Sequence, residues 1–402
     1  MRHFGVGFGV KCVVTLSFGL GAWTSVEAQR LYWLGVLPGF VRSEARDVSN
    51  DGVAVGIAYN SEDTPRAFRW ARQSGLQDLG TLGGVQSEAY GISADGVVIV
   101  GRAEKGNLDR VAYRWTASTG MQPILDVSSK AFATSADGSV VVGWYGRYPN
   151  MQAFRWRVGY GMQSLPYPHG YPSEGYFEAF GVSADGETVV GDLGESARAF
   201  RWTAQTGTQL LGTLGGPSSE AMDVSADGSV IVGGSIDAQG RMRAYRWTAA
   251  TGMQDLGALE IGQSFAHGVS GDGAVVVGIS GNAQGIFQAF RWTAATGMQN
   301  LNLVYASLLT NGSRLEGARN ISPNGRYIVG WGFNAATGRA EAFLLDTGVE
   351  GDVDGNGCVD DADLLQVLFA FGGQGGAADV NGDGIVDDAD LLIVLFNFGQ
   401  GC

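Results

Sequence analysis

The sequence is poor in the side chains that metal-dependent and covalent catalysis most often use. Its 402 residues include three cysteines and three histidines, and only His169 and His267 lie beyond the N-terminal segment. It contains no histidine pair at zinc-type spacing, no nucleophile elbow and no phosphate-cradling glycine loop. We therefore expect no catalytic residues and no organic cofactor.

Basic side chains are also few. Lysine and arginine together number 26 against 40 aspartates and glutamates, which gives a formal net charge of −14. No basic stripe is present to neutralise phosphates, and this excludes nucleic acid as a partner. Residues 350–402 hold eleven acids and no lysine or arginine. The acidity is therefore local, and it predicts a cation-binding segment at the C-terminal end.

Long apolar runs are absent after the first 28 residues. The runs at 364–371 and 391–398 are too short to cross a bilayer, so no membrane span is expected in the mature chain. Residues 1–28 combine a basic start, an apolar centre interrupted by glycines and Lys11, and small residues up to Ala28. This pattern predicts a signal peptide cut after Ala28, and hence a secreted protein, extracellular or at the cell surface.

The cysteines divide between the two ends of the chain. Cys12 lies in the predicted signal peptide, which leaves Cys358 and Cys402 in the acidic segment. An even pair in an exported chain predicts a disulfide that ties the C-terminus to the first acidic loop. Two free thiols are the alternative.

The middle of the chain is a sevenfold repeat. Each copy has an Asp-Gly or Asn-Gly turn, a valine-rich run that ends in glycine, an Ala-aromatic-Arg-Trp run and a Met-Gln-Asp-Leu-Gly-like run. Asp-Gly between apolar runs is a strong hairpin signal. The turns begin at Asp51, Asp95, Asp137, Asp185, Asp227, Asp272 and Asn324.

Four short strands in about 45 residues is the size of a propeller blade. The seventh copy stops at Asp346 without its fourth run, and residues 32–39 supply an orphan fourth run that matches residues 78–84 of the first copy. The sequence therefore predicts an all-β domain over residues 29–347, a seven-bladed β-propeller closed by the N-terminal strand. An open β-solenoid would not need this complementarity.

The repeated Val-Ser-Ala-Asp-Gly and Ala-Phe-Arg-Trp sequences resemble the HAF-type extracellular repeats of exported bacterial proteins. The resemblance covers about residues 31–347 and implies no activity. The arginine of each third run is interpreted as a hydrogen-bond donor between blades.

Residues 352–363 and 379–390 repeat one pattern at a distance of 27 residues. Oxygen-bearing side chains stand at positions 1, 3, 5, 9 and 12 with glycine at position 6, which is the spacing of an EF-hand loop. The pattern predicts two bound Ca²⁺ ions. The predicted ligands are Asp352, Asp354, Asn356, the backbone carbonyl of Cys358, Asp360 and Asp363 in the first loop, and Asp379, Asn381, Asp383, the backbone carbonyl of Ile385, Asp387 and Asp390 in the second.

Each loop precedes a helix-like apolar run, at 364–371 and 391–398. Two units of loop and exiting helix resemble a type I dockerin over residues 348–402. The resemblance implies a cohesin-like protein or a cell-surface scaffold as partner, and an association with extracellular polysaccharide degradation. Positions 10 and 11 carry Asp-Ala instead of the hydroxyl-bearing pair typical of dockerins. We expect the two helices to cover most of the rings of Phe369, Phe371, Phe396 and Phe398; a partner or the propeller is the alternative.

Two classes of function remain open. The first is a non-catalytic exported binding protein displayed through its dockerin-like module, favoured by the near-identity of the blades. The second is a carbohydrate-active enzyme, such as a glycoside hydrolase, recruited through the same module. An aromatic insert at residues 166–177, which contains His169 and Glu174, is interpreted either as a glycan-binding loop or as a rigid proline-locked loop.

Overall fold

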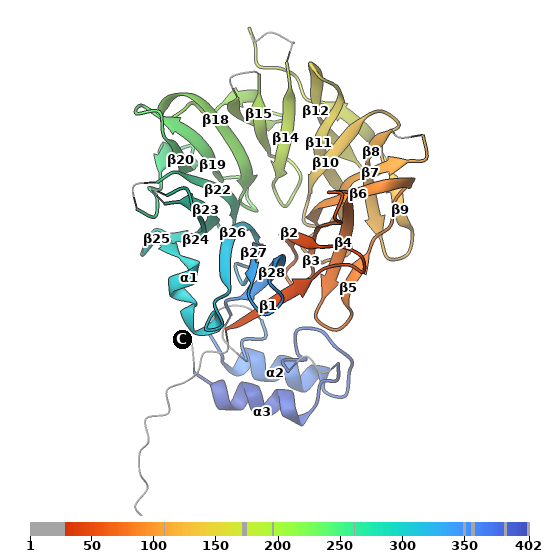
Figure 1. The fold of residues 1–402 in the computed structure, drawn as a ribbon, viewed down its shortest axis with the longest axis vertical. Helices are drawn as coiled ribbons and strands as arrows, with labels where there is room; N and C mark the ends of the chain where they lie inside the picture. The colour runs from red at the N-terminus through yellow and green to blue at the C-terminus, as the bar shows by residue number, and fades with distance from the viewer. Residues whose placement is uncertain are drawn as a thin grey trace, which may run out of the picture.

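The computed structural model describes residues 29–107, 109–170, 175–194, 197–260, 262–282, 284–348, 351–354, 358–381 and 384–399. Seven four-stranded antiparallel sheets stand side by side in a ring (Figure 1). The chain thus folds into a seven-bladed β-propeller, as the repeat count predicts. The first strand of each blade contacts the first strands of both neighbouring blades, so these seven strands form the wall of the central channel.

The strand bounds follow the repeat closely. Blade one is β2 Arg42–Val48, β3 Ala54–Tyr59, β4 Pro65–Ala71 and β5 Gly75–Asp78, and blade two is β6 Gly83–Ile92, β7 Ile99–Lys105, β8 Arg110–Thr116 and β9 Gly120–Pro123. Blade three is β10 Ser129–Thr134, β11 Val140–Arg147, β12 Asn150–Arg157 and β13 Gly161–Ser164, and blade four is β14 Phe177–Val182, β15 Val189–Leu193, β16 Arg198–Thr203 and β17 Gly207–Leu210.

The remaining blades repeat the same plan. Blade five is β18 Gly215–Val224, β19 Val230–Asp237, β20 Met242–Thr248 and β21 Gly252–Asp255, and blade six is β22 Ser264–Val269, β23 Val275–Gly281, β24 Phe287–Thr293 and β25 Gly297–Asn300. A short connection, α1 Leu301–Val304 and the 3₁₀ turn η1 Ala306–Leu308, leads to blade seven, which is β26 Arg314–Ile321, β27 Tyr327–Asn334, β28 Arg339–Asp346 and β1 Arg30–Gly35.

Ring closure by the N-terminal strand is confirmed. β1 pairs antiparallel with β28, with Leu31 opposite Leu345 and Trp33 opposite Phe343. The rings of Trp33 and Phe343 also meet edge to face. Blade seven therefore joins the two ends of the propeller chain, and its sheet is completed from the far end of the sequence.

The Asp-Gly turns show why the motif recurs. In blade three, Ser135 Oγ donates to Asp137 Oδ1 at 2.7 Å and accepts from the backbone N–H of Val140 at 3.0 Å. Gly138 has a φ of 69°, which a residue with a side chain rarely adopts. The side chains of the turn thus stabilise it. This agrees with the prediction that these aspartates are turn residues.

A circle of backbone hydrogen bonds joins these turns from blade to blade. The residue before each turn aspartate donates its N–H to the carbonyl of the equivalent residue in the next blade. The donor–acceptor pairs are Asn50–Ala94, Ala94–Ala136, Ala136–Ala184, Ala184–Ala226, Ala226–Gly271 and Gly271–Pro323. Three of the repeated arginines add to this joint: Arg114, Arg155 and Arg246 donate to the turn carbonyls of Gly138, Gly186 and Gly273 in the following blade, which confirms the interpretation for these three. Arg69 and Arg201 donate instead to Gln77 and Thr188 of their own blade.

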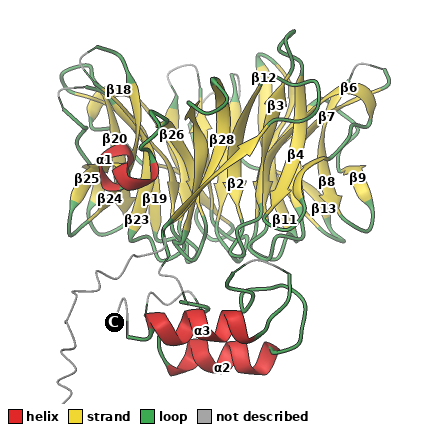
Figure 2. Cartoon of the chain, turned by 60° about the horizontal axis from the view of Figure 1, so that its bottom comes forward, coloured by secondary structure: helices red, strands yellow, loops and turns green. Residues whose placement is uncertain are grey.

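Two stacked helices, α2 Asp361–Ala370 and α3 Asp388–Asn397, lie beside the turn face of the propeller (Figure 2). Both begin three residues before the predicted apolar runs, because Asp360 and Asp387 cap their N-termini with capping boxes. Their small shared core contains Val359, Val367 and Val394. Within the described part of the chain, no helix has the length and apolar character needed to span a membrane.

The expectation that the helices would cover their phenylalanine rings is wrong. Phe369 and Phe396 are 85% and 80% exposed, and Phe371 and Phe398 about half exposed. Valine, not phenylalanine, occupies the helix–helix contact, because Val367 and Val394 lie on the same helical faces as the buried Asp363 and Asp390.

Candidate metal centre and propeller channel

The first acidic loop brings three predicted ligands together. One carboxylate oxygen each from Asp352, Asp354 and Asp363 lies within 4.8 Å of the other two. Asp352 and Asp363 are buried, whereas Asp354 is exposed. Like charges so close together repel each other strongly unless a cation lies between them. No lysine or arginine occurs in residues 350–402, and Arg326 of the propeller contacts Asp352 through its backbone carbonyl.

The residue at position 12 also organises the loop. Asp363 Oδ1 accepts from the N–H groups of Val353 and Asp354 at 2.6 and 3.0 Å, and its Oδ2 accepts from Asp360 N at 2.8 Å. One carboxylate therefore joins the start of the loop to the start of α2. The short aspartate arm suits these contacts, which explains why glutamate is not needed at this position.

The second loop repeats this arrangement. Asp390 Oδ1 accepts from Asn381 N at 2.9 Å and its Oδ2 from Asp387 N at 3.0 Å. Asp379 Oδ2 accepts from Gly384 N at 3.0 Å, which closes the loop on itself. Asp379 and Asp390 are buried like their counterparts in the first loop. The two loops are thus alike in structure as well as in sequence.

The remaining predicted ligands differ in where the structure places them. Asp360 and Asp387 act as helix N-caps, each accepting through Oδ1 from a backbone N–H two residues on at 2.8 Å. Asn356 and Asp383 lie outside the described residues. The carbonyls of Cys358 and Ile385 stay predicted ligands. All of these donors are oxygen atoms, which is the donor set of a hard cation such as Ca²⁺.

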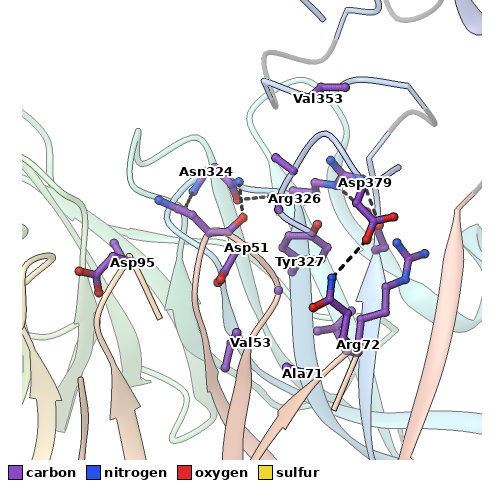
Figure 3. Close-up of a pocket in the computed structure, with 18 of the residues that line it drawn as sticks. Asp51, Val53, Ala71, Arg72, Asp95, Asn324, Arg326, Tyr327, Val353 and Asp379 are labelled. Atoms are coloured by element: carbon purple, nitrogen blue, oxygen red, sulfur yellow. Dashed lines mark hydrogen bonds and ion pairs between the residues drawn. The ribbon is translucent and has the colours of Figure 1, made fainter. Parts of the chain in front are cut away.

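Both loops touch the propeller at their first position. Arg326 Nη1 donates to the carbonyl of Asp352 at 2.9 Å, and Gln73 Nε2 donates to Asp379 Oδ2 at 3.2 Å. Arg326 is itself held by Asp346, the last residue of β28, at 2.9 Å. These contacts border a cavity of about 920 Å³ between the turns and the loops, into which Asp51 and Arg72 also project (Figure 3). The loops are therefore seated over the turn face of the propeller.

A second set of residues, on the two innermost strands of each blade, was not predicted from the sequence. In every blade an alanine of the first strand faces a glycine of the second, the pairs being Ala45–Gly56, Ala89–Gly101, Ala131–Gly143, Ala179–Gly191, Ala221–Gly233, Ala266–Gly278 and Ala318–Gly330. The next facing pair, which we call the channel pair, differs in every blade. The channel pairs are Glu44–Ile57, Glu88–Arg102, Lys130–Trp144, Glu178–Asp192, Glu220–Gly234, Phe265–Ile279 and Gly317–Trp331.

The contrast between these neighbouring positions is informative. The alanine–glycine pair is uniform because the carbonyl of the preceding first-strand residue comes close to the glycine: a Cβ on Gly191 would lie 1.9 Å from Glu178 O and 2.9 Å from the Phe200 ring. The channel pair varies in charge and size, and it is packed against a ring in some blades: a Cβ on Gly234 would lie 2.3 Å from the Phe265 ring, and one on Gly317 would lie 2.0 Å from the Trp331 ring. The near-identity of the blades, which favours a non-catalytic protein, therefore holds for the alanine–glycine positions and not for the channel pairs. Aligning the residue after each repeat glycine would have shown this from sequence.

The charged channel residues fall into two arcs. In blades seven, one and two, Arg319 and Arg46 contact Glu44, and Arg102 pairs with Glu88 at 2.8 Å. In blades four and five, the carboxyl groups of Glu178, Asp192 and Glu220 form a second arc, which we call the acidic arc. Among the described residues no arginine or lysine forms an ion pair with any of the three. Ion pairs thus compensate the first arc. In the acidic arc, burial raises the pKa of Glu178 although the charge of Lys130 opposes the shift, and among the described residues no cation acts in this way on Asp192 or Glu220.

The acidic arc includes the most buried of these carboxyl groups. Asp192 is 5% exposed, and its Oδ1 has no hydrogen-bond partner among the described residues. Burial, and then the negative charges of Glu220 and Glu178, raise the pKa of Asp192 well above its usual range. Burial raises the pKa of Glu220 as well. These groups hold protons more tightly than free carboxylic acids do.

Comparison with known proteins bears on the fold alone. No family model and no curated protein matches this sequence. Among solved structures, the putative TolB from Agrobacterium tumefaciens is 16% identical with a TM-score of 0.45, covering 77% of this chain and 99% of that one. TolB from Acinetobacter baumannii is 14% identical with a TM-score of 0.40, covering 64% of this chain and 62% of that one.

A third similar structure comes from a structural and mechanistic analysis of two prolyl endopeptidases. It is 11% identical with a TM-score of 0.51, and the match covers 76% of this chain and 50% of that one. The present chain therefore spans about half the length of that protein. At this identity the likeness shows a shared fold and carries no information on activity.

Proposed function

We propose that this protein is an exported, non-catalytic binding and display protein that attaches to its partner through a calcium-dependent, dockerin-like module at residues 348–402. The observation that carries the proposal is the pairing of two matched acidic loops with two helices whose large apolar side chains face solvent. Residues 29–347 would then be the displayed propeller domain.

Calcium binding is supported by the donor set and by its electrostatics. Each loop buries two aspartates, Asp352 with Asp363 and Asp379 with Asp390. Burying two carboxylates in one loop is costly, and a divalent cation offsets that cost. A metal ion that binds only the folded module stabilises the folded state by the free energy of binding. We therefore expect the module to depend on two Ca²⁺ ions for its stability.

Docking is supported by the exposed face of the helix pair. A large contiguous apolar surface is unusual on a monomer and typically marks an interaction site. The side chains concerned are 46–85% exposed: Leu365, Leu368, Phe369, Phe371, Leu392, Leu395, Phe396 and Phe398. A cohesin-like protein or cell-surface scaffold is the partner that the dockerin resemblance suggests. The Asp-Ala pairs at positions 10 and 11 predict a recognition preference different from that of hydroxyl-bearing dockerins.

Two further elements of the proposal rest on residues at the chain ends. The predicted signal peptide, residues 1–28, and Cys402, the predicted disulfide partner of Cys358, lie outside the described residues. Export and the disulfide therefore remain predictions from sequence. Mass spectrometry of the secreted protein, with and without reductant, checks both the cleavage after Ala28 and the disulfide.

The proposal is tested on residues 29–402. Calorimetric titration should give two Ca²⁺ ions per chain, and immobilised recombinant cohesins should retain the calcium-loaded protein. A Phe369→Ser, Phe396→Ser variant should bind calcium normally and lose retention, because its rings lie outside the loops. Two ions without retention by any cohesin would make the module a metal-stabilised cap on the propeller. Failure to bind calcium would refute the proposal.

The second candidate, a glycoside hydrolase recruited through the same module, has one observation in its favour. Glycosidases use two carboxyl groups placed across the sugar, and the acidic arc offers Glu178 and Glu220 on neighbouring blades. Glu174, in the aromatic insert, lies outside the described residues. Sugar release from soluble polysaccharides that is lost in Glu220→Gln would favour the hydrolase.

A further inference from the structure

The acidic arc is a departure from the repeat at several positions at once. Glu178 and Asp192 form the one channel pair in which both residues are acidic, and Glu220 follows in the next blade. The strands that carry Asp192 and Glu220, β15 and β18, are in contact across the blade interface. Three carboxyl groups therefore gather on one side of a channel whose packed positions are otherwise uniform.

A buried hydroxyl group joins the same cluster. The aromatic residue of the third strand is phenylalanine in five blades and tyrosine in two, Tyr113 and Tyr245, and all seven are fully buried. The Tyr245 hydroxyl has no hydrogen-bond partner among the described residues. Tyr245 lies opposite Gly233, and a Cβ on Gly233 would be 1.9 Å from Glu220 O, so the ring lies next to the segment that carries Glu220. Burial, and then the negative charges of Glu220 and Asp192, raise the pKa of Tyr245 well above its usual range.

Unpartnered buried polar atoms are expensive, and a structure that holds them commonly satisfies them with a bound group. Here there are two within one cluster, Asp192 Oδ1 and the Tyr245 hydroxyl, beside two more carboxyl groups. Phenylalanine at position 245 and alanine at position 192 would pack in the same fold without the cost of burying polar atoms that lack hydrogen-bond partners. Burial and mutual repulsion oppose ionisation of these carboxyl groups. A bound cation that donates hydrogen bonds removes this repulsion and can satisfy both Asp192 Oδ1 and the Tyr245 hydroxyl.

The spacing of the acids distinguishes an organic cation from a bare metal ion. Among the described residues, the one group of three acidic side chains with oxygens within 4.8 Å of one another is in the first calcium loop. The acidic arc is more widely spread than that, so it fits a cation with several separated donors. An aromatic path, Tyr90–Phe132–Phe180, leads to it with successive ring centroids 5.5 and 4.9 Å apart.

The channel already accommodates an ammonium group on this path. Lys130 Nζ lies 4.0 Å from the ring centroid of Tyr90 and 4.6 Å from that of Phe132. Ring faces attract cations, and Lys130 already occupies those of Tyr90 and Phe132, so Phe180 is the ring of this path that remains for another cation. Phe180 lies next on the path, in the same strand as Glu178.

We propose that the central channel binds an organic cation, an alkyl ammonium or guanidinium group, on the carboxyl groups of Glu178, Asp192 and Glu220 and the hydroxyl of Tyr245. This site is separate from the calcium loops and does not depend on the docking proposal. The group is carried both by small polyamines and by arginine or lysine side chains of peptides.

Calorimetry on calcium-loaded residues 29–402 at about 150 mM salt tests the proposal, with agmatine, spermidine and the capped tripeptide Gly-Arg-Gly as probes. We expect one equivalent of at least one probe to bind, and the better probe identifies a small-molecule or a peptide source. Glu220→Gln and Asp192→Asn should each weaken binding at least about tenfold, since each removes one charge-assisted contact.

Glu62→Gln is the matched control, because Glu62 is an exposed acid of blade one and its loss changes the net charge equally. It should leave binding unchanged. Glu220 is only half-buried, so its variant keeps the test valid even where Asp192→Asn unfolds the blade. Absence of binding by all three probes, or equal binding by Glu220→Gln and wild type, would overturn the proposal.

Discussion

The side-chain amide of Asn324 donates to the backbone carbonyl of Asn50 across 3.1 Å, and so joins two residues 274 positions apart. In the other six blades the equivalent bond comes from a backbone N–H. Blade seven has Pro323 at that position, which has no N–H to give. Asn324 supplies the missing donor, and its own N–H donates to Asn50 Oδ1 at 2.9 Å. The circle of bonds around the turns is thereby completed by a side chain.

This arrangement predicts a non-additive pair of substitutions. Asn324→Asp restores the aspartate found in the other turns but removes the donor, and should lower the free energy of unfolding by about 1–2 kcal/mol. Adding Pro323→Ala restores a backbone N–H, so the double variant should recover most of that loss. Chemical denaturation followed by tryptophan fluorescence measures both. Additive losses in the double variant would show that the circle is not what Asn324 serves.

Arg326 is predicted to control the seating of the calcium module. It pairs with the largely buried Asp346 and also donates to Asp352 O. Arg326→Ala leaves Asp346 without its partner and should cost about 2–3 kcal/mol, with faster proteolytic cleavage between propeller and module. Arg42→Ala, which breaks an exposed pair with Asp63, should cost less than about 1 kcal/mol. Equal effects of the two variants would contradict this role.

The calcium loops are predicted to lose ions one at a time. Asp363→Asn should reduce the calorimetric stoichiometry from two ions to one, and Asp390→Asn should do the same through the other loop. The neighbouring exposed acids provide controls of equal charge: Asp361→Asn and Asp388→Asn should keep both ions. A stoichiometry of two in Asp363→Asn would remove that residue from the ligand set.

His267 predicts a loss of stability in acid. Its Nδ1 donates to Ala318 O at 3.0 Å and its Nε2 accepts from Arg319 Nη1 at 3.2 Å, an arrangement that requires the neutral ring. Burial, and then the charge of Arg319, lower the pKa of His267 to about 3. The unfolded chain, with an ordinary histidine, binds more protons than the folded one between pH 6.5 and about 3. The free energy of unfolding therefore decreases as the pH is lowered through that window, by up to about 1.4 kcal/mol per pH unit.

Unfolding curves between pH 4 and 7.5 check this expectation. His267→Asn keeps a donor for Ala318 O but has no proton to gain, so its stability should depend less steeply on pH than that of wild type. His169→Asn removes an exposed histidine and should leave the slope unchanged. A slope for His267→Asn equal to that of wild type would exclude the ring as the source.

The propeller could be predicted from sequence because the same packing pattern recurs in each of the seven blades. Valine runs, the turn glycines and the strand missing from the seventh copy all depend on local chemistry that recurs. The apolar runs predict helix starts that are three residues too late, because the helices begin at the N-caps Asp360 and Asp387, which precede the apolar residues. The exposure of Phe369 and Phe396 depends on how two helices pair, which a single helix pattern does not specify.

The channel was the larger omission, for a physical reason. Glu178, Asp192 and Glu220 are separated by up to 42 positions and are unremarkable acids in their own strands. The packing of neighbouring blades, through the contact of β15 with β18, brings these acids together. A comparison of Gly191-Asp192 with Gly56-Ile57 and Gly233-Gly234 would have marked the variable position, yet its place on the channel wall follows from the fold.

The pairing of β1 with β28 has a mechanical consequence. A protein held by its C-terminal module and pulled by flow or by a bound surface would receive the load at Asp346, along the axis of β28. Hydrogen-bonded strands flank β28 on both sides, β1 and β27, so their bonds are sheared together and not opened one after another. The blade that closes the ring is thus also the one best placed to bear tension, and the N-terminal strand reinforces the tether.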